Sequence, residues 1–243
     1  DLKGTLKSAT TVIGGTATDN QGHGTHVSGI IAAQANNGKG GSGVAPGASL
    51  YVYKVSDGSS INMSYVITAM NKARDDGMDI LNLSLGGPTY NGTVANAIKS
   101  MYDSGVAVFC SSGNDDTNAL NYPASYKGAI SIAAIDKGAQ KSSFSSYGSK
   151  VRYAAPGVDI ISTAKSCSYV SMDGTSMACP ATAGTAAVVL QYARAKKLYT
   201  EKGTSADVTN LLKAMDKGTM KAKGTGLGKG YVNLPKALGL SDA

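Results

Sequence analysis

A series of short, continuous apolar runs alternates with helix-like segments, and this alternation most constrains the fold. The runs cover residues 50–55, 80–85, 106–110 and 129–135. Apolar periodicity predicts helices near residues 60–74 and 94–104 between them. Strands that are apolar on both faces and joined by helices are typical of parallel sheets covered on both sides. The sequence therefore predicts an α/β fold with three layers, α/β/α, around a central, mostly parallel sheet.

Length and composition fit one domain over residues 1–243. The chain is 42% apolar and contains 31 glycines, as expected for a globular protein with many tight turns. Its net charge is +7, but aromatic residues do not interleave with the lysines, which favours a basic surface over nucleic-acid binding. No apolar run reaches the ~18 residues that a membrane span needs. We therefore expect neither nucleic acid nor membrane as a partner.

The three cysteines cannot all pair within the chain. Cys110 and Cys179 lie in apolar surroundings and are expected to be buried small hydrophobic residues, whereas Cys167 lies in a polar loop. None of them shows the spacing of a zinc site. The sequence begins at Asp1 without an initiator Met or a signal peptide, which suggests a processed chain.

Glycine-rich polar segments follow two of the predicted strands, at residues 84–87 and 111–114. In a parallel sheet covered by helices, the functional site lies at the carboxyl ends of the strands. Asn114, beside Gly113, could donate a hydrogen bond to an oxyanion there. A lone Gly-Asn pair is, however, more often a left-handed turn.

The turn at residues 173–180 runs into the apolar stretch 181–195, which is predicted to be helical. Ser176 would then stand at a helix N-terminus, where unpaired backbone N–H groups favour developing negative charge. This is a suitable place for a nucleophile. The alternative is that Thr175 or Ser176 only caps the helix.

The only two histidines, His23 and His26, lie three residues apart near the start of a predicted helix at residues 23–33. Histidine is suited to take a proton from a serine hydroxyl near neutral pH. The same spacing would allow both rings to bind a metal ion. That alternative lacks the Glu of an H-E-x-x-H motif and a third ligand, so a general base is favoured.

Seven short motifs occur in one order: G-H-G-T-H-V-S-G-I at 22–30, S-L-G-G-P at 84–88, S-S-G-N at 111–114, Y-P-A-S-Y at 122–126, S-F-S-S-Y-G at 143–148, A-A-P-G-V at 154–158 and G-T-S-M-A-C-P at 174–180. In kind and order they resemble the subtilisin-like serine peptidases (subtilases), from Asp1 to about Leu238. The resemblance implies a subtilisin-like fold and peptide-bond hydrolysis. It assigns His23 as general base, Ser176 as nucleophile and Asn114 as oxyanion donor, with His26 as a packing residue.

The same resemblance implies a cleft for a polypeptide substrate in extended conformation. An added peptide strand would pair with one wall, and the other wall would form the pocket for the residue before the scissile bond. The implied substrate-binding residues are Leu83, Ser84, Leu85, Gly86, Ser111, Ser112 and Gly113, with Asp115 and Asn121 near the pocket floor. If Asp115 points inward, the pocket should favour basic and polar side chains.

A structural calcium ion is also implied by the resemblance. Its ligands would come from Asp1 and from a glycine-rich loop, at Ala35, Asn37, Lys39 and Gly41. Carboxylate, amide and carbonyl oxygens are the ligands that Ca²⁺ prefers.

The third member of the family's catalytic triad has no match in this chain. The family's Asp lies in a D-[ST]-G turn, and none occurs before His23; Asp19 belongs to the segment that leads into His23. One interpretation is that the Asp and its strand lie on an N-terminal fragment of the same precursor. The other is a catalytically crippled subtilase-fold protein that binds peptides or a partner. The first is favoured because loss of a central strand exposes backbone and core.

The resemblance has two further implications. The protein is expected to be secreted or extracytoplasmic. A propeptide inhibitor is a further candidate partner.

Overall fold

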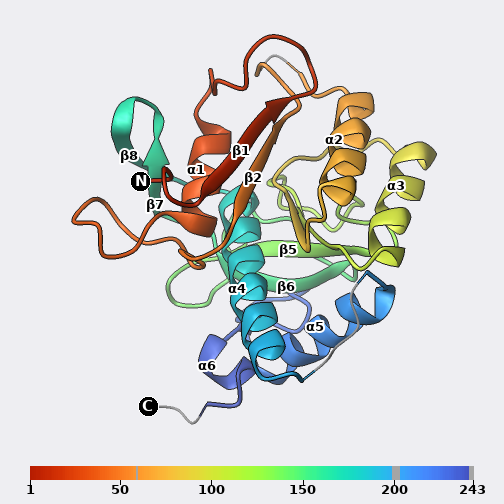
Figure 1. Ribbon diagram of the computed structural model, residues 1–243. Helices are drawn as coiled ribbons and strands as arrows, with labels where there is room; N and C mark the ends of the chain where they lie inside the picture. The colour runs from red at the N-terminus through yellow and green to blue at the C-terminus, as the bar shows by residue number, and fades with distance from the viewer. Residues whose placement is uncertain (59, 199–202, 241–243) are drawn as a thin grey trace.

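A four-stranded parallel sheet lies at the centre of the molecule, shown as a computed structural model in Figure 1. The structure describes residues 1–58, 60–198 and 203–240. The sheet order is β3-β4-β5-β6. Its strands are β3 (Ile80–Leu83), β4 (Ala107–Ser111), β5 (Ala129–Ile135) and β6 (Val151–Pro156). The first three coincide closely with predicted apolar runs, whereas β6 was not predicted.

Helices cover both faces of this sheet, because alternate residues of each strand point to opposite sides. In β4, Ala107 and Phe109 pack in the core that contains α4 (Thr175–Ala195) and α5 (Ser205–Lys217). Val108 and Cys110 pack in a second core with α2 (Met63–Asp75) and α3 (Gly92–Asp103). The predicted three-layer α/β/α arrangement is confirmed.

The remaining elements lie around this centre. Two strands, β1 (Leu6–Thr11) and β2 (Leu50–Lys54), form a separate parallel pair, and α1 (His23–Ala32) lies beside it (Figure 1). An antiparallel hairpin consists of β7 (Ile160–Ala164) and β8 (Ser168–Met172), joined by a short 3-10 turn, Lys165–Cys167. Near the C-terminus are the short pair β9 (Thr219–Met220) and β10 (Tyr231–Val232) and helix α6 (Leu234–Ala237).

Strand β1, at residues 6–11, was not predicted, and one predicted boundary was wrong. The last long helix was expected to follow Pro180, yet α4 begins at Thr175 and contains Pro180 in its interior. Its first turn therefore carries Ser176 as part of the helix.

Two of the expectations about individual residues are confirmed. Cys110 and Cys179 are fully buried, and Cys167 is exposed. Among the described residues, no helix has both the length and the apolar character to cross a membrane.

Candidate functional site

Asp19 fixes the start of α1, the helix that carries His23 as its first residue. Its carboxylate accepts hydrogen bonds from the backbone N–H groups of Gln21, Gly22 and Thr25, at 2.9, 2.8 and 2.9 Å. Burial raises the pKa of Asp19, but these bonds outweigh burial and lower it to about 2. Asp19 thus satisfies unpaired groups at a helix N-terminus, in agreement with its assignment to the segment leading into His23.

The His23 ring is half-buried and makes no hydrogen bond to any other residue that the structure describes. Burial lowers its pKa below 6.5, the neighbouring His26 lowers it further, and Asp19 partly opposes both effects. Burial and His26 therefore favour the neutral ring, the form that accepts a proton.

Helix α1 packs against the start of α4. Val27 and Ile30 of α1 form one buried cluster with Met177, the residue after Ser176. His23 lies one turn before Val27, so this packing brings the N-terminal ends of the two helices together.

Asn114 is held at the N-terminus of α4 by Thr175. The Asn114 Oδ1 accepts hydrogen bonds from the Thr175 backbone N–H at 2.9 Å and from its hydroxyl at 2.8 Å. The Thr175 hydroxyl also accepts from the Gly113 N–H at 3.2 Å. Neither Thr175 nor Ser176 caps α4 with its side chain, so the capping alternative was wrong. Sequence reasoning treated Thr175 only as a possible cap and missed this positioning role.

Two hydrogen-bond donors converge beside Gly174, which has a φ of +152°. A Cβ atom at this position would lie 3.5 Å from Asn114 Nδ2 and 3.5 Å from the Ser176 backbone N. Since Asn114 Oδ1 is occupied by Thr175, the Nδ2 group is left to face this space. Glycine leaves room there for a small negatively charged atom.

Pro180 and Ser84 together hold the backbone of Ser176. Proline has no N–H, so Pro180 cannot make the hydrogen bond that an α-helix would direct to the Ser176 carbonyl four residues earlier. The Ser84 hydroxyl donates to that carbonyl instead, at 2.8 Å. Ser84 in turn accepts from Asn82 Nδ2 at 3.0 Å. The Ser176 hydroxyl lies 3.4 Å from the Ser84 carbonyl oxygen, a long contact.

The two expected substrate walls enclose Asn121. A Cβ atom at Gly86 would lie 2.9 Å from Asn121 Oδ1, and one at Gly113 would lie 2.3 Å from its Nδ2. The Nδ2 group donates to the Ser112 carbonyl at 3.1 Å, whereas the buried Oδ1 has no partner among the described residues. Asn121 therefore lies between the walls, and Asp115 is exposed.

The other expected wall residues lie on both sides of this space. Leu83 and Ser111 end strands β3 and β4 as buried residues, Ser112 is buried directly after β4, and Leu85 is half-buried.

His26 is fully buried and lies away from any cluster of metal ligands. Its Nε2 lies 3.0 Å from both the Ile160 and the Val170 carbonyl oxygens, so the ring ties α1 to the β7–β8 hairpin. Within the described part of the chain, no three His, Cys, Asp or Glu residues gather as a metal ion would require. The arrangement favours the packing interpretation of His26.

In this structure the side chains of Asp1 and Asn37, both expected to bind calcium, are hydrogen-bonded to protein groups. Asp1 Oδ1 accepts a hydrogen bond from the Asn37 amide, and Oδ2 accepts from the Tyr169 hydroxyl at 2.8 Å. Asn37 Oδ1 accepts from the Lys39 backbone N–H at 3.0 Å, which fixes its amide with Nδ2 toward Asp1. The carboxylate and amide oxygens that Ca²⁺ would need are thus engaged by protein donors. Asn37, Lys39 and Gly41 are exposed, and Ala35 is half-buried.

Comparison with known proteins identifies the class that this fold and site define. Residues 7–228 match the model of the subtilase family. Subtilisin DY of Bacillus licheniformis is 40% identical over 200 residues, which cover 80% of this chain and 73% of that protein. Thermitase of Thermoactinomyces vulgaris is 40% identical over 226 residues, 92% of this chain and 77% of that protein. Subtilisin Savinase of Lederbergia lenta is 44% identical over 174 residues, 71% of this chain but only 64% of that protein.

The chain belongs to the subtilase family, the subtilisin-like serine peptidases. The resemblance seen in the seven motifs is confirmed.

Proposed function

We propose that the protein is a serine endopeptidase in which Ser176 is the nucleophile and His23 the general base. The observation that supports this proposal is the packing of α1, which begins with a histidine of lowered pKa, against the start of α4, which carries Ser176 in its first turn. Asn114 Nδ2 and the Ser176 N–H supply the oxyanion donors, since both face the space beside Gly174.

The reaction follows from these roles. His23 takes the Ser176 hydroxyl proton as the oxygen attacks the carbonyl carbon of an extended polypeptide. The negative charge moves to the carbonyl oxygen, where the two donors stabilise it. Collapse of this intermediate breaks the C–N bond, and His23 gives its proton to the leaving amine. Water then attacks the acyl group in the same way and restores the Ser176 hydroxyl.

Full activity requires a carboxylate that orients His23, and we assign it to a segment outside residues 1–243. The most direct source is an N-terminal fragment of the same precursor. Asp19 cannot serve, because its oxygens bind the start of α1. Loss of this carboxylate function costs about 10⁴ in kcat in chymotrypsin-like serine peptidases.

We further propose that residues 1–243 act as one peptidase domain that is secreted or extracytoplasmic. A propeptide is proposed as its inhibitor. The family supports these assignments.

An internally quenched peptide assay tests the oxyanion role. Asn114→Ala should lower kcat with little change in KM, because the donor acts on charge that develops only in the transition state. The scale is borrowed from subtilisin itself, where loss of the oxyanion asparagine costs roughly 10²–10³ in rate. Asn118→Ala, an exposed change in the same loop, is the control. Equal rates for both variants would remove Asn114 from the site.

A substrate library tests the pocket floor. Asp115 is exposed and follows Asn114 directly, and we propose that its charge gives a preference for basic or polar side chains before the scissile bond. Lys substrates should be turned over faster than Leu substrates, and Asp115→Asn should reduce that difference. Equal turnover that is unaffected by Asp115→Asn would reject the assignment.

The second candidate function is peptide or partner binding without catalysis. It is favoured by one observation, that no described residue hydrogen-bonds the His23 ring. A fluorophosphonate probe separates the two functions, because only an activated serine reacts with it. Material that binds peptides but does not react would support the binding function.

A further inference from the structure

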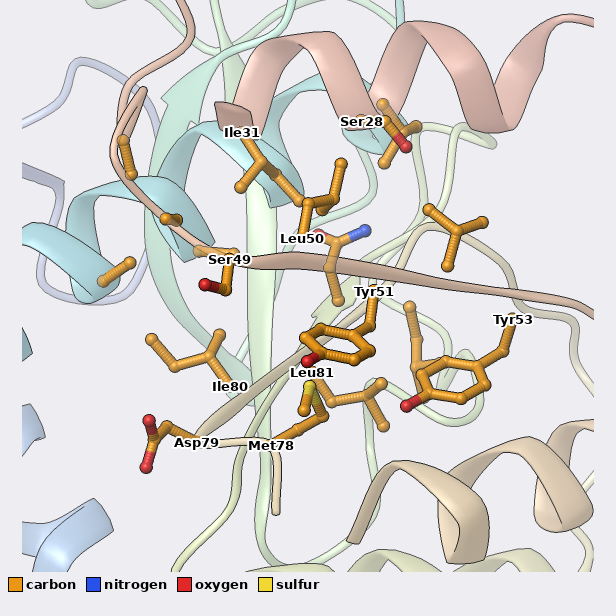
Figure 2. Close-up of a pocket in the computed structure, with 18 of the residues that line it drawn as sticks. Ser28, Ile31, Ser49, Leu50, Tyr51, Tyr53, Met78, Asp79, Ile80 and Leu81 are labelled. Atoms are coloured by element: carbon orange, nitrogen blue, oxygen red, sulfur yellow. The ribbon is translucent and has the colours of Figure 1, made fainter. Parts of the chain in front are cut away.

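The chain between α1 and β2 leaves the packed interior as an exposed loop. Ile31 near the end of α1 and Leu50 at the start of β2 both line a cavity of about 960 Å³ between β2 and β3 (Figure 2). The Gly43 backbone N–H donates to the Ala33 carbonyl at 2.9 Å, which closes the loop at its base. Beyond this bond, residues 36–42 are exposed. The loop is therefore fixed at both ends and open to water between them.

This loop contains an Asn-Gly pair, Asn37–Gly38. Asparagine is chemically labile, because the next backbone nitrogen can attack its side-chain amide carbon, and a following glycine has no Cβ to hinder that attack. Gly38 has a φ of +72°, and a Cβ atom there would meet nothing within 4 Å. Its N–H makes no hydrogen bond to any residue that the structure describes. The attacking nitrogen is therefore accessible and not engaged elsewhere.

Attack closes a five-membered ring, for which the Asn37 side chain and the following peptide unit must turn toward each other. In the described chain, residues 35–42 take part in no backbone–backbone hydrogen bond that would resist this turn. Two bonds hold the asparagine side chain: Nδ2 donates to Asp1 Oδ1, and Oδ1 accepts from the Lys39 N–H at 3.0 Å. Both bonds are exposed, so water can replace them at small cost. The loop can therefore open locally while the rest of the fold stays intact.

The chain's other Asn-Gly pair, Asn91–Gly92, lies in the opposite environment. Asn91 is the N-cap of α3, and its Oδ1 accepts from the Thr93 and Val94 N–H groups at 2.9 and 3.2 Å. The Tyr126 hydroxyl accepts from the Asn91 N–H at 2.7 Å and donates to the Asn91 carbonyl at 3.0 Å. Ring closure at Asn91 would break these bonds and the start of α3. The fold therefore protects one of two identical dipeptides and leaves the other unprotected.

We propose that Asn37 is a site of spontaneous deamidation, and that the reaction releases a contact of the N-terminus. The Gly38 nitrogen loses its proton and bonds to Asn37 Cγ, the Cγ–Nδ2 bond breaks, and the amide group leaves as ammonia. Water then opens the resulting succinimide at either carbonyl, which gives aspartate or isoaspartate at position 37. The net reaction consumes one water and releases one ammonia. It does not depend on the peptidase function.

The product changes the surroundings of Asp1. Asp1 Oδ1 loses the donor that Asn37 supplied and faces a second negative charge instead. Its Oδ2 still accepts from the Tyr169 hydroxyl at 2.8 Å, and its backbone carbonyl still accepts from the Gln34 N–H at 2.9 Å. Deamidation should therefore loosen the N-terminal segment without unfolding the protein.

Peptide mapping by mass spectrometry tests the site. The Ser176→Ala protein of residues 1–243 is incubated at mildly alkaline pH with a chelator, so that neither cleavage nor a bound divalent cation interferes. We expect Asn37 to become a mixture of aspartate and isoaspartate, faster as the pH rises, while Asn91 stays an amide. In concentrated urea the two pairs should convert at similar rates, because the fold no longer distinguishes them. Equal rates in the folded protein, or conversion of Asn37 only in urea, would overturn the proposal.

Two glycine variants of the same loop test the chemistry. Gly38→Ala should slow conversion at least about tenfold, because the added Cβ hinders the attacking nitrogen. Gly41→Ala is the matched control, since a Cβ there also meets nothing within 4 Å, and it should leave the rate unchanged. Conversion of Asn37 at the same rate in both variants would also overturn the proposal.

Asn37→Asp tests the consequence. In the presence of the chelator it should lower the thermal unfolding midpoint, because two carboxylates then face each other. The exchanged pair, Asp1→Asn with Asn37→Asp, again places one amide opposite one carboxylate and should recover most of the loss. An unchanged midpoint for Asn37→Asp would overturn the effect on the N-terminus and leave the deamidation site standing.

Discussion

The Ser84 hydroxyl donates the hydrogen bond that Pro180, which has no N–H, cannot make. The Ser176 carbonyl has lost its helical donor, and Ser84 replaces it at 2.8 Å. The pattern of polar residues after an apolar strand predicted that Ser84 would lie near the site. Its partner could not be predicted, because the bond depends on α4 beginning before Pro180, and a helix interior is where proline is least expected.

Ser84→Ala should lower both stability and kcat. Removal of the hydroxyl leaves the partly buried Ser176 carbonyl without a donor, at a cost of about 1 kcal/mol. Thermal unfolding and single-turnover kinetics measure the two effects. Ser84→Thr, which keeps the hydroxyl, should recover most of both, and the exposed change Ser149→Ala should alter neither. Wild-type values for Ser84→Ala would contradict this role.

The His23 ring should titrate below pH 6.5 in residues 1–243. Burial and His26 disfavour its charged form, and only Asp19 opposes them. The neutral form, which accepts the serine proton, therefore persists at lower pH than for a free histidine. NMR can follow this directly, because the chain has only two histidines and His26→Gln assigns them. A pKa at or above 6.5 would contradict the described environment.

Among the elements, α1 is placed by its close approach to the β7–β8 hairpin at Gly29. A Cβ atom there would lie 2.2 Å from Thr163 Oγ1 and 2.3 Å from Ser162 Oγ. Both hydroxyls already donate to carbonyls of α1, at Thr25 and His26. Neither side chain can move away without losing its hydrogen bond.

Gly29→Ala should therefore destabilise the protein by about 1–3 kcal/mol, the usual cost of overpacking. The matched control is Gly92→Ala in the first turn of α3, where the nearest atom lies 3.9 Å away. That change should be neutral or stabilising by about 0.4–1 kcal/mol, because alanine narrows the unfolded ensemble. Urea unfolding measures both. A Gly29→Ala protein as stable as the control would show that α1 does not depend on this contact.

The sequence predicted best the strands that are apolar on both faces and the helices that have clear apolar periodicity. β3, β4 and β5 are apolar on both faces, and α2 and α3 begin at asparagine caps, Asn62 and Asn91. β1 escaped prediction because its residues are half polar and its burial alternates along the strand. β8 escaped because most of its residues are exposed. In both cases contacts distant in sequence decide the conformation.

For the whole molecule, the sequence predicted the layers and the principal site residues but not the contacts between residues that are distant in the chain. His23, Asn114 and Ser176 stood out because each combined a reactive side chain with a glycine-bearing turn. The role of Thr175 and the cavity between β2 and β3 depend on three-dimensional neighbours. The calcium ligands that the resemblance implies stay a prediction.

Stability should fall as the pH decreases from about 4 toward 2. The folded pKa values of Asp19, about 2, and Asp216 lie below the ordinary value of 3.8. Depressed carboxyl pKa values contribute stability above the unfolded pKa, and this contribution is lost as the pH falls through the folded value. Asp19→Asn should lower the unfolding midpoint at pH 7 and flatten its acid dependence, whereas Asp103→Asn, at an exposed ion pair, should not. An unfolding midpoint that does not change between pH 4 and pH 2 would contradict the stabilising role of these two carboxylates.

The most direct test of the central claim is mass-spectrometric mapping of a fluorophosphonate adduct on the native protein. We predict one adduct, on the Ser176 oxygen, that disappears in Ser176→Ala and becomes much slower in His23→Ala. An adduct on another residue, or no adduct on the native material, would contradict the assignment of this chain as a serine peptidase.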